Sequence, residues 1–133
     1  MANSQKILNK IAILITFLFI ISLITLKFHW YYTIWWFDMP MHFLGGVFLG
    51  LSVLFVISKY LPRLIVYSTS GLSLNTVILV FMLVLMIGLF WEIFELLNDH
   101  FFQLNQQNTL DTVSDLFFDM SGGLAAVVYF FKK

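Results

Sequence analysis

The sequence contains no cysteine and only two prolines. Charged residues make up only 11% of the chain. The absence of cysteine excludes disulfides and thiolate metal sites. The scarcity of charge excludes a soluble domain of this size, because such a domain must cover its surface with charged side chains. Hydrophobic residues instead make up 61% of the 133 residues. We therefore expect an integral membrane protein whose main partner is the lipid bilayer, with no nucleic acid among its partners.

Four apolar segments are each close to the roughly 20 residues that a helix needs to cross a bilayer. They cover about residues 7–27, 38–60, 74–97 and 110–131. Asp38 and Pro40 stand where the second segment begins, as an N-cap and a first-turn proline often do. The predicted fold is all-α, an integral membrane four-helix bundle that forms a single transmembrane domain over residues 1–133.

Charge is distributed unequally between the two ends of these predicted helices. The basic residues Lys6, Lys10, Lys59, Arg63, Lys132 and Lys133 fall at the end that carries both termini, whereas Lys27 falls at the other. Because basic residues favour the cytoplasmic side, both termini are predicted to be cytoplasmic in the cell membrane. All seven acidic residues then lie in the outer half, next to residues 29–37, whose aromatic side chains predict an interfacial belt.

The last three predicted helices each carry one stripe of polar and small residues at helical spacing. Positions three or four apart lie on one face of a helix. Ionisable side chains that face lipid cost at least roughly 2.5–3.5 kcal/mol each, so the stripes should face one another. The candidate ligand residues are Asp38, His42, Glu92, Glu95, Asp111, Asp115 and Asp119. The candidate helix-packing residues, where small side chains allow close contact, are Gly45, Gly46, Gly50, Gly88, Gly122 and Gly123.

Crowded carboxylates in a low-dielectric interior cannot all stay ionised without a counter-charge. A histidine with several carboxylates suits a divalent metal ion such as Mg²⁺, Mn²⁺, Ca²⁺ or Zn²⁺. The first hypothesis is therefore an outward-facing site that binds a cation or a cell-envelope ligand. The second is a metal-dependent enzyme that acts on a lipid-linked or envelope substrate. The third is a protonated polar network that only holds the helices together.

Other roles for individual residues stay open at this point. Asp38 could serve only as an N-cap, and Asp99 and Asp111 could be solvated carboxylates at the water boundary. An ion carrier is disfavoured because four helices leave little room for alternating access, unless the protein is a homo-oligomer.

The order of these motifs resembles that of the VanZ-like membrane proteins and of the related YjdF-type small membrane proteins. The matching residues, within roughly residues 36–130, are Asp38, His42, Trp91, Glu92, Glu95, Asp111, Asp115, Asp119, Gly122 and Gly123. Glu95 and Asp119 stand where the VanZ pattern usually has glutamine and asparagine, so the chain looks closer to the YjdF type. Neither family has a settled biochemical activity. The resemblance therefore implies a small polytopic bacterial membrane protein and names no substrate.

Overall fold

The computed structural model describes residues 2–62, 74–102 and 109–132, and these residues are almost entirely helical. The helices are α1 (Ala2–Phe28), α2 (Trp30–Thr33), α3 (Asp38–Tyr60), α4 (Leu74–Phe102) and α5 (Thr109–Phe131). Within the described residues, four helices are long and apolar enough to cross a membrane, namely α1 from Gln5 onward, α3, α4 and α5. A helix satisfies all of its backbone hydrogen bonds internally, as a lipid environment requires. The predicted all-α fold with four membrane-spanning helices is confirmed.

Two helices are longer than the hydrophobic pattern predicts. The first was expected to begin near residue 7, but α1 begins at Ala2, and the Gln5 amide donates a hydrogen bond to Asn9 Oδ1 one turn later at 3.1 Å. The third spanning helix was expected to end near residue 97, but α4 continues to Phe102. There the Asn98 side-chain amide donates to the Phe94 carbonyl at 2.8 Å, so this polar residue stays within the helix. Hydropathy marks the edge of the apolar segment, whereas the helix itself extends into the polar region.

The segment between α1 and α3 reverses the chain and contains the short helix α2. His29 adopts a left-handed conformation with φ of 55°, which ends α1, and histidine is among the residues that tolerate this region. Phe37 is the N-cap of α3 and makes no capping side-chain hydrogen bond, so Asp38 is the first helical residue. The hypothesis that Asp38 serves only as an N-cap is therefore wrong. Its carboxylate is available to the acidic cluster.

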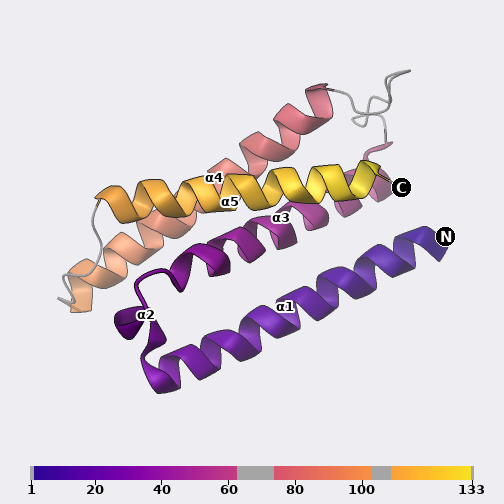
Figure 1. Ribbon diagram of the computed structural model, residues 1–133. Coiled ribbons are helices and arrows are strands. Elements are labelled where there is room, and N and C mark those ends of the chain that lie inside the picture. The colour runs from indigo at the N-terminus through magenta and orange to yellow at the C-terminus, as the bar shows by residue number, and fades with distance from the viewer. Residues whose placement is uncertain (1, 63–73, 103–108, 133) are drawn as a thin grey trace.

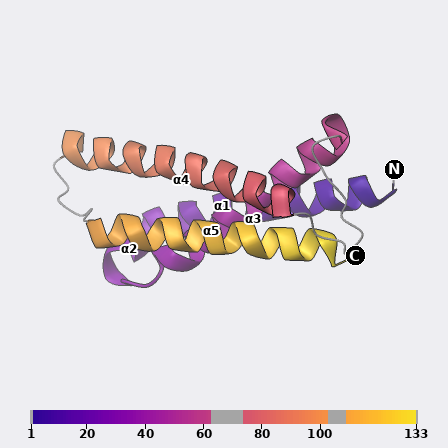
Figure 2. The same cartoon turned by 90° about the horizontal axis from the view of Figure 1, so that it is seen from above.

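The three helices that carry the polar stripes pack together, and α1 lies at one side of them. Figure 1 shows α3 and α5 running side by side in the same direction, with α4 crossing them and both termini at one end. Figure 2 shows the same three helices from above. Helix α1 packs mainly against α3. Near the end that carries the termini, Lys10 Nζ on α1 donates a hydrogen bond to the Tyr129 hydroxyl on α5.

Small residues bring the backbones of α3 and α5 into direct contact. A Cβ atom placed on Gly46 would lie only 2.7 Å from the carbonyl carbon of Asp119, and one on Gly122 would lie 2.8 Å from the Val47 nitrogen. One turn further along, a Cβ on Gly50 would lie 2.7 Å from that of Ala126. Such separations exclude any side chain larger than hydrogen, as in other close helix pairs that use small residues. We refer to this contact as the α3–α5 seam.

Beyond the seam, towards the end that carries the termini, the bundle has an apolar core. Leu54 of α3, Val80 and Val84 of α4, and Val127 of α5 are almost completely buried and contact one another. We call this region the aliphatic half.

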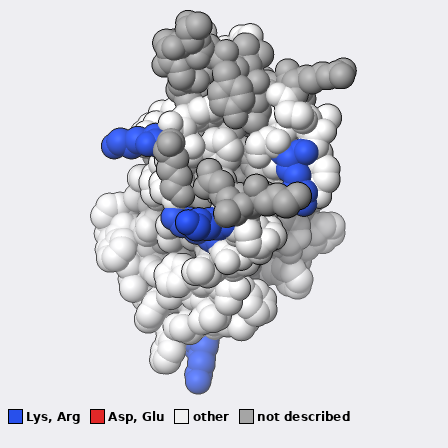
Figure 3. Space-filling view, turned by 90° about the vertical axis from the view of Figure 1, so that its right-hand side faces the viewer, with Lys and Arg blue, Asp and Glu red and all other residues white. Residues whose placement is uncertain are grey.

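The end of the molecule that carries both termini is basic. Among the described lysines, Lys6 and Lys10 lie near the start of α1, Lys59 lies near the end of α3, and Lys132 follows α5. Figure 3 looks onto this end, and the described part of the face shows basic and no acidic side chains. Arg63 and Lys133, which were also predicted at this end, lie outside the described residues.

Candidate functional site

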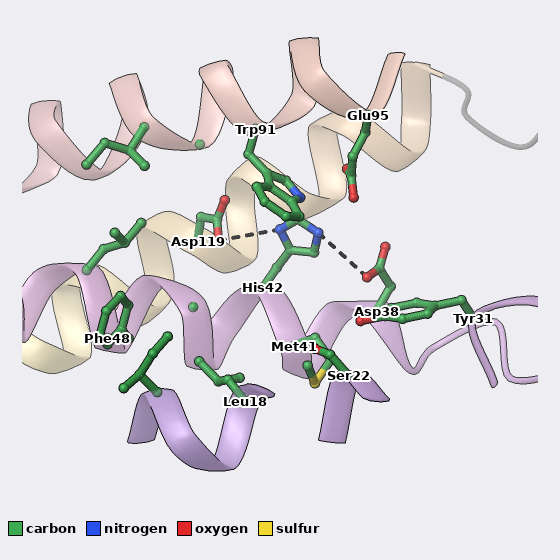
Figure 4. A pocket seen from close by; sticks show the side chains of 15 residues that line it. Leu18, Ser22, Tyr31, Asp38, Met41, His42, Phe48, Trp91, Glu95 and Asp119 are labelled. Atoms are coloured by element: carbon green, nitrogen blue, oxygen red, sulfur yellow. Dashed lines mark ion pairs between the residues drawn. The ribbon is translucent and has the colours of Figure 1, made fainter. Parts of the chain in front are cut away.

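The side chain of His42 lies at the centre of the acidic cluster and faces carboxylates on both sides. On one side, His42 Nδ1 lies 3.4 Å from Asp119 Oδ1 of α5. On the other, Nε2 lies 3.6 Å from Asp38 Oδ1, one turn earlier on α3, and 3.9 Å from Asp115 Oδ1 of α5. Figure 4 shows the imidazole between Asp38 and Asp119. The contact with Asp119 is a long hydrogen bond, whereas the attraction to Asp38 and Asp115 is mainly Coulombic, because those separations exceed hydrogen-bond range.

Two glycines make room for the Asp119 carboxylate between α3 and α4. A Cβ atom on Gly88 of α4 would lie 2.9 Å from Asp119 Oδ2, and one on Gly45 of α3 would lie 3.8 Å from Oδ1. Both glycines were predicted to bring helix backbones together. Their neighbours on other helices include the acidic side chain of Asp119, whereas Gly46 and Gly122 of the α3–α5 seam face backbone atoms. Gly123 differs again, because its nearest neighbours are the methyl groups of Val84.

Four ligand groups from three helices converge on one point. His42 of α3, Glu92 and Glu95 of α4, and Asp115 of α5 each offer a ligand atom, and these atoms all lie within 4.8 Å of one another. We call this group the four-residue cluster. Trp91 donates a hydrogen bond to the Glu95 side chain, which helps to orient that carboxylate. A second group within the same distance combines Asp38 and Asp111 with Asp115. All seven predicted ligand residues thus lie in or beside one cluster, and we call this end of the bundle the acidic half.

The central side chains of the acidic half are buried. His42, Glu92, Asp115 and Asp119 are each at most 7% exposed. Burying several ionised groups is costly unless each is compensated by opposite charge or by hydrogen bonds. A protonated His42 would supply a single positive charge against the carboxylates of Asp38, Glu92, Glu95, Asp115 and Asp119. The arrangement therefore favours further neutralisation by a cation or by protons.

A cavity of about 360 Å³ borders this cluster. His42, Asp38, Glu95 and Asp119 contribute to its wall, together with residues from α1 and α2 that the sequence analysis did not single out. Ser22 of α1 and Tyr31 of α2 are two of these, and their hydroxyls are hydrogen-bonded to each other. Burial, and next the negative charge of Asp38, raise the pKa of Tyr31 above its ordinary value. Ser22 is a polar residue within an apolar helix, and this polarity is a feature of the sequence that could have indicated that α1 contributes to the cavity.

The aromatic segment therefore has two roles in the structure. Trp35 and Trp36 point outward, as an interfacial belt predicts, and are 81% and 52% exposed. Tyr31 instead lines the cavity and packs edge-on against Phe37, with ring centroids 5.6 Å apart.

Comparison with known proteins places the chain in a family without assigning it an activity. None of the curated proteins and none of the solved structures matches it significantly. The family described as "Predicted membrane protein (DUF2238)" matches residues 3–133, almost the full length. That description agrees with the four apolar helices of the structure. The chain belongs to this family of predicted membrane proteins.

Proposed function

We propose that the protein binds a divalent metal ion at the four-residue cluster of His42, Glu92, Glu95 and Asp115. The observation that carries this proposal is the convergence of four potential ligand atoms, from three helices, within 4.8 Å of one another. Oxygen and imidazole ligands lie at about 2.0–2.6 Å from Mg²⁺, Mn²⁺, Ca²⁺ or Zn²⁺. Two ligands on opposite sides of one ion are therefore about 4–5 Å apart. The side chains could hold such an ion with only small movements.

The charges of the surrounding residues support a cation over an anionic ligand. The cluster and its neighbours Asp38 and Asp119 supply five carboxylates and one imidazole. Among the described residues, no lysine or arginine lines the adjoining cavity. A divalent ion would offset two negative charges at the point where they converge, which protonation of His42 alone cannot do.

A protonated polar network is the rival interpretation, and the ion pairs of His42 favour it to some extent. A histidine that faces three carboxylates on two helices can tie α3 to α5 without any bound ion. However, only the contact with Asp119, at 3.4 Å, is a hydrogen bond, and the distances of 3.6 and 3.9 Å to Asp38 and Asp115 are too long for one. A network that only locks helices together is expected to close such bonds.

Metal-dependent catalysis on a lipid-linked or envelope substrate is a second candidate function. The observation that favours it is that His42 and Glu95 belong both to the four-residue cluster and to the cavity wall. An ion bound at the cluster would therefore be accessible to a polar group in the cavity. In that case the ion would act as a Lewis acid or activate a bound water.

The ion-binding proposal is tested by thermal unfolding of the purified protein in detergent. After treatment with a chelator, Mg²⁺, Mn²⁺, Ca²⁺ and Zn²⁺ are added separately. At about 100 times its Kd, a ligand of the folded state stabilises that state by about 2.7 kcal/mol. We therefore expect at least one ion to raise the Tm by several degrees.

Substitutions separate a shared ion site from independent contacts. Glu92→Gln and Asp115→Asn should each abolish the ion-dependent shift in Tm, and the double variant should lose little more, because ligands of one site act non-additively. Asp99→Asn, a carboxylate on α4 outside the cluster, is the matched control and should retain the shift. If no ion shifts the Tm of the parent protein, the cation site is excluded and the polar network is favoured.

The proposed site faces outward, in the cell membrane of a bacterium, with both termini in the cytoplasm. This orientation follows from the lysines at the end that carries the termini and from the positive-inside rule. It would expose the acidic half to cell-envelope ligands. Because the chain has no cysteine, a single introduced cysteine reports its own location. In intact cells, Thr109→Cys should react with an impermeant thiol reagent and Lys132→Cys should not. The reverse labelling pattern would place the acidic half on the cytoplasmic side.

A further inference from the structure

The cavity beside His42 is polar at one end and apolar at the other. On α3 its wall passes from Asp38 and His42 to Phe48 and Leu49, and on α4 it passes from Glu95 to Ile87. At 1.5 Å per residue, the distance along α3 from Asp38 to Leu49 is about 16 Å.

Helix α1 shows the same change along its length. Its residue nearest to α2 in this wall is Ser22, and further from α2 the wall continues with Leu18 and Ile15. Three helices thus give the cavity the polarity of an amphiphile, with a charged end and an apolar end.

At the apolar end, the cavity wall is formed by Ile15 and Leu18 of α1 and by Ile87 of α4. Helix α1 packs mainly on α3, and Lys10 joins its first half to α5. The wall residues at this end are exposed: Ile15 of α1 by 43% and Ile87 of α4 by 38%. Both helices are apolar enough to span a bilayer, so the surroundings at this depth are lipid acyl chains. A hydrocarbon chain can therefore enter this cavity sideways from the membrane.

We propose that the cavity binds a single-chain amphiphile with an ammonium headgroup. The hydrocarbon chain lies along Leu18, Phe48 and Ile87, and the headgroup lies beside Asp38, His42 and Glu95. The volume of about 360 Å³ is at the lower end of the about 300–1,000 Å³ typical of small-molecule sites. It is sufficient for one chain and a compact headgroup, and too small for a two-chain phospholipid.

The charge of the headgroup follows from the residues at the polar end. Asp38, Glu95 and Asp119 are carboxylates, and the described wall contains no lysine or arginine that would bind a phosphate or a carboxylate. An anionic headgroup would be repelled at this position by the carboxylates of Asp38, Glu95 and Asp119.

Two aromatic rings of the wall add to this preference. Figure 4 shows Tyr31 beside Asp38, and Trp91 belongs to the same wall. Aromatic faces attract alkylammonium groups by about 0.5–2 kcal/mol.

The amphiphile site does not depend on the proposed ion site. Only the predicted antagonism between the two ligands rests on the proposed function. His42 and Glu95 are shared between the four-residue cluster and the cavity wall. A bound divalent ion would reduce the negative charge that attracts the ammonium group. Binding of the ion and of the amine should therefore be antagonistic, and each should weaken the other by the same factor.

The experiment uses quenching of Trp91 fluorescence in phosphatidylcholine proteoliposomes that contain a chelator. The other three tryptophans (Trp30, Trp35 and Trp36) are replaced with phenylalanine. The probes are 11-bromoundecylamine, 11-bromoundecanol and 11-bromoundecanoate, which have the same chain and differ in the charge of the headgroup. We expect saturable quenching by the amine at a concentration at least tenfold below that of the other two probes. Equal or non-saturating quenching by all three would overturn the proposal, as would tighter binding of the carboxylate.

Two substitutions distinguish the ends of the cavity. Leu18→Phe adds bulk to the apolar wall and should weaken binding of the amine at least tenfold. Leu23→Phe is the matched control on the lipid-facing side of α1 and should leave binding unchanged. Glu95→Gln should weaken binding of the amine but not of the alcohol, which provides a test even if Leu18→Phe fails to fold.

The results also separate this inference from the proposed function. If the amine binds saturably but no divalent ion shifts the Tm, only the ion site is excluded. If an ion shifts the Tm but the amine shows no saturable quenching, only the amphiphile site is excluded.

Discussion

The acidic half and the aliphatic half of the bundle are built from the same three helices, yet one buries ionisable groups beside a cavity and the other is packed with apolar side chains. In the aliphatic half, Leu54, Val80, Val84 and Val127 fill the space between α3, α4 and α5 with apolar side chains. In the acidic half the same helix faces carry His42 and the carboxylates, and a cavity adjoins them. The α3–α5 seam separates the two halves.

The difference indicates a division of labour along the bundle. Lipid tails are as apolar as leucine, so burial of aliphatic groups gives little net driving force in a membrane, and helix association depends on close packing. The seam and the aliphatic half provide that packing. They allow the acidic half to keep ionisable groups and a cavity that contribute less to stability. If this is correct, substitutions in the seam should be the most damaging and substitutions at the rim of the acidic half the least.

The largest effect is expected at the seam. Gly46→Ala would place a methyl group 2.7 Å from the carbonyl carbon of Asp119, so the backbones of α3 and α5 would have to separate. We expect a loss of about 3 kcal/mol or more in the free energy of unfolding, measured by titration with a denaturing detergent.

The adjacent glycine provides the control. At Gly45 the nearest atom outside its own helix backbone to an added methyl group, Asp119 Oδ1, is at an ordinary contact distance of 3.8 Å. Gly45→Ala should therefore be neutral, or stabilising by up to about 1 kcal/mol through helix propensity. Equal destabilisation by both substitutions would show that the seam is not the critical contact.

A smaller effect on the free energy of unfolding is expected when a buried polar side chain of the aliphatic half is replaced with an apolar one, or the reverse. Thr76 of α4 is fully buried, and its hydroxyl has no hydrogen-bond partner among the described residues. Thr76→Val should raise the free energy of unfolding by about 1 kcal/mol, because it removes a buried hydroxyl.

Val84→Thr is the reciprocal change two turns along the same helix, and Val84 is also fully buried. It should lower the free energy of unfolding by about 1–2 kcal/mol, measured by the same titration. If Val84→Thr were silent, the aliphatic half would not depend on being apolar.

The smallest effect is expected at the rim of the acidic half. Asp111 lies in the first turn of α5, where a carboxylate interacts favourably with the helix N-terminus by about 0.3–1 kcal/mol. Asp111→Asn should lower the free energy of unfolding by less than about 1 kcal/mol and should retain the ion-dependent shift in Tm. Loss of that shift would instead place Asp111 among the ligands, through the second group that it forms with Asp38 and Asp115.

The sequence predicts the fold well because the bilayer imposes a simple rule. Four apolar segments of sufficient length must form helices, and this prediction is confirmed. The exact ends of α1 and α4 were not predictable from hydropathy, because polar residues such as Gln5 and Asn98 continue the helix through side-chain hydrogen bonds. The four-residue helix α2 was missed because it is too short for a periodic pattern.

The sequence predicts which residues belong to the candidate site, but it does not predict which atoms each residue contacts. Helical spacing predicts that His42, Glu92 and Asp115 face inward, since ionisable groups avoid lipid. It does not predict which glycine contacts a backbone and which contacts a carboxylate, because that depends on the crossing of two helices. Gly46 and Gly88 have the same residue type and the same place in a stripe, yet only Gly46 lies in the seam. The cavity depends on how α1 leans against α3, which no sequence pattern records.

The contact between α3 and α5 has a consequence for the order in which the protein can assemble during synthesis. These two helices are not neighbours in the sequence, since all of α4 lies between them. Because synthesis proceeds from the N-terminus, His42, Glu92 and Glu95 are synthesised before Asp115 and Asp119. Until α5 inserts, the glycine face of α3 has no partner helix, and the acidic groups of α4 lack their neighbours on α5. Insertion of α5 thus completes the packing and the candidate site in a single late step.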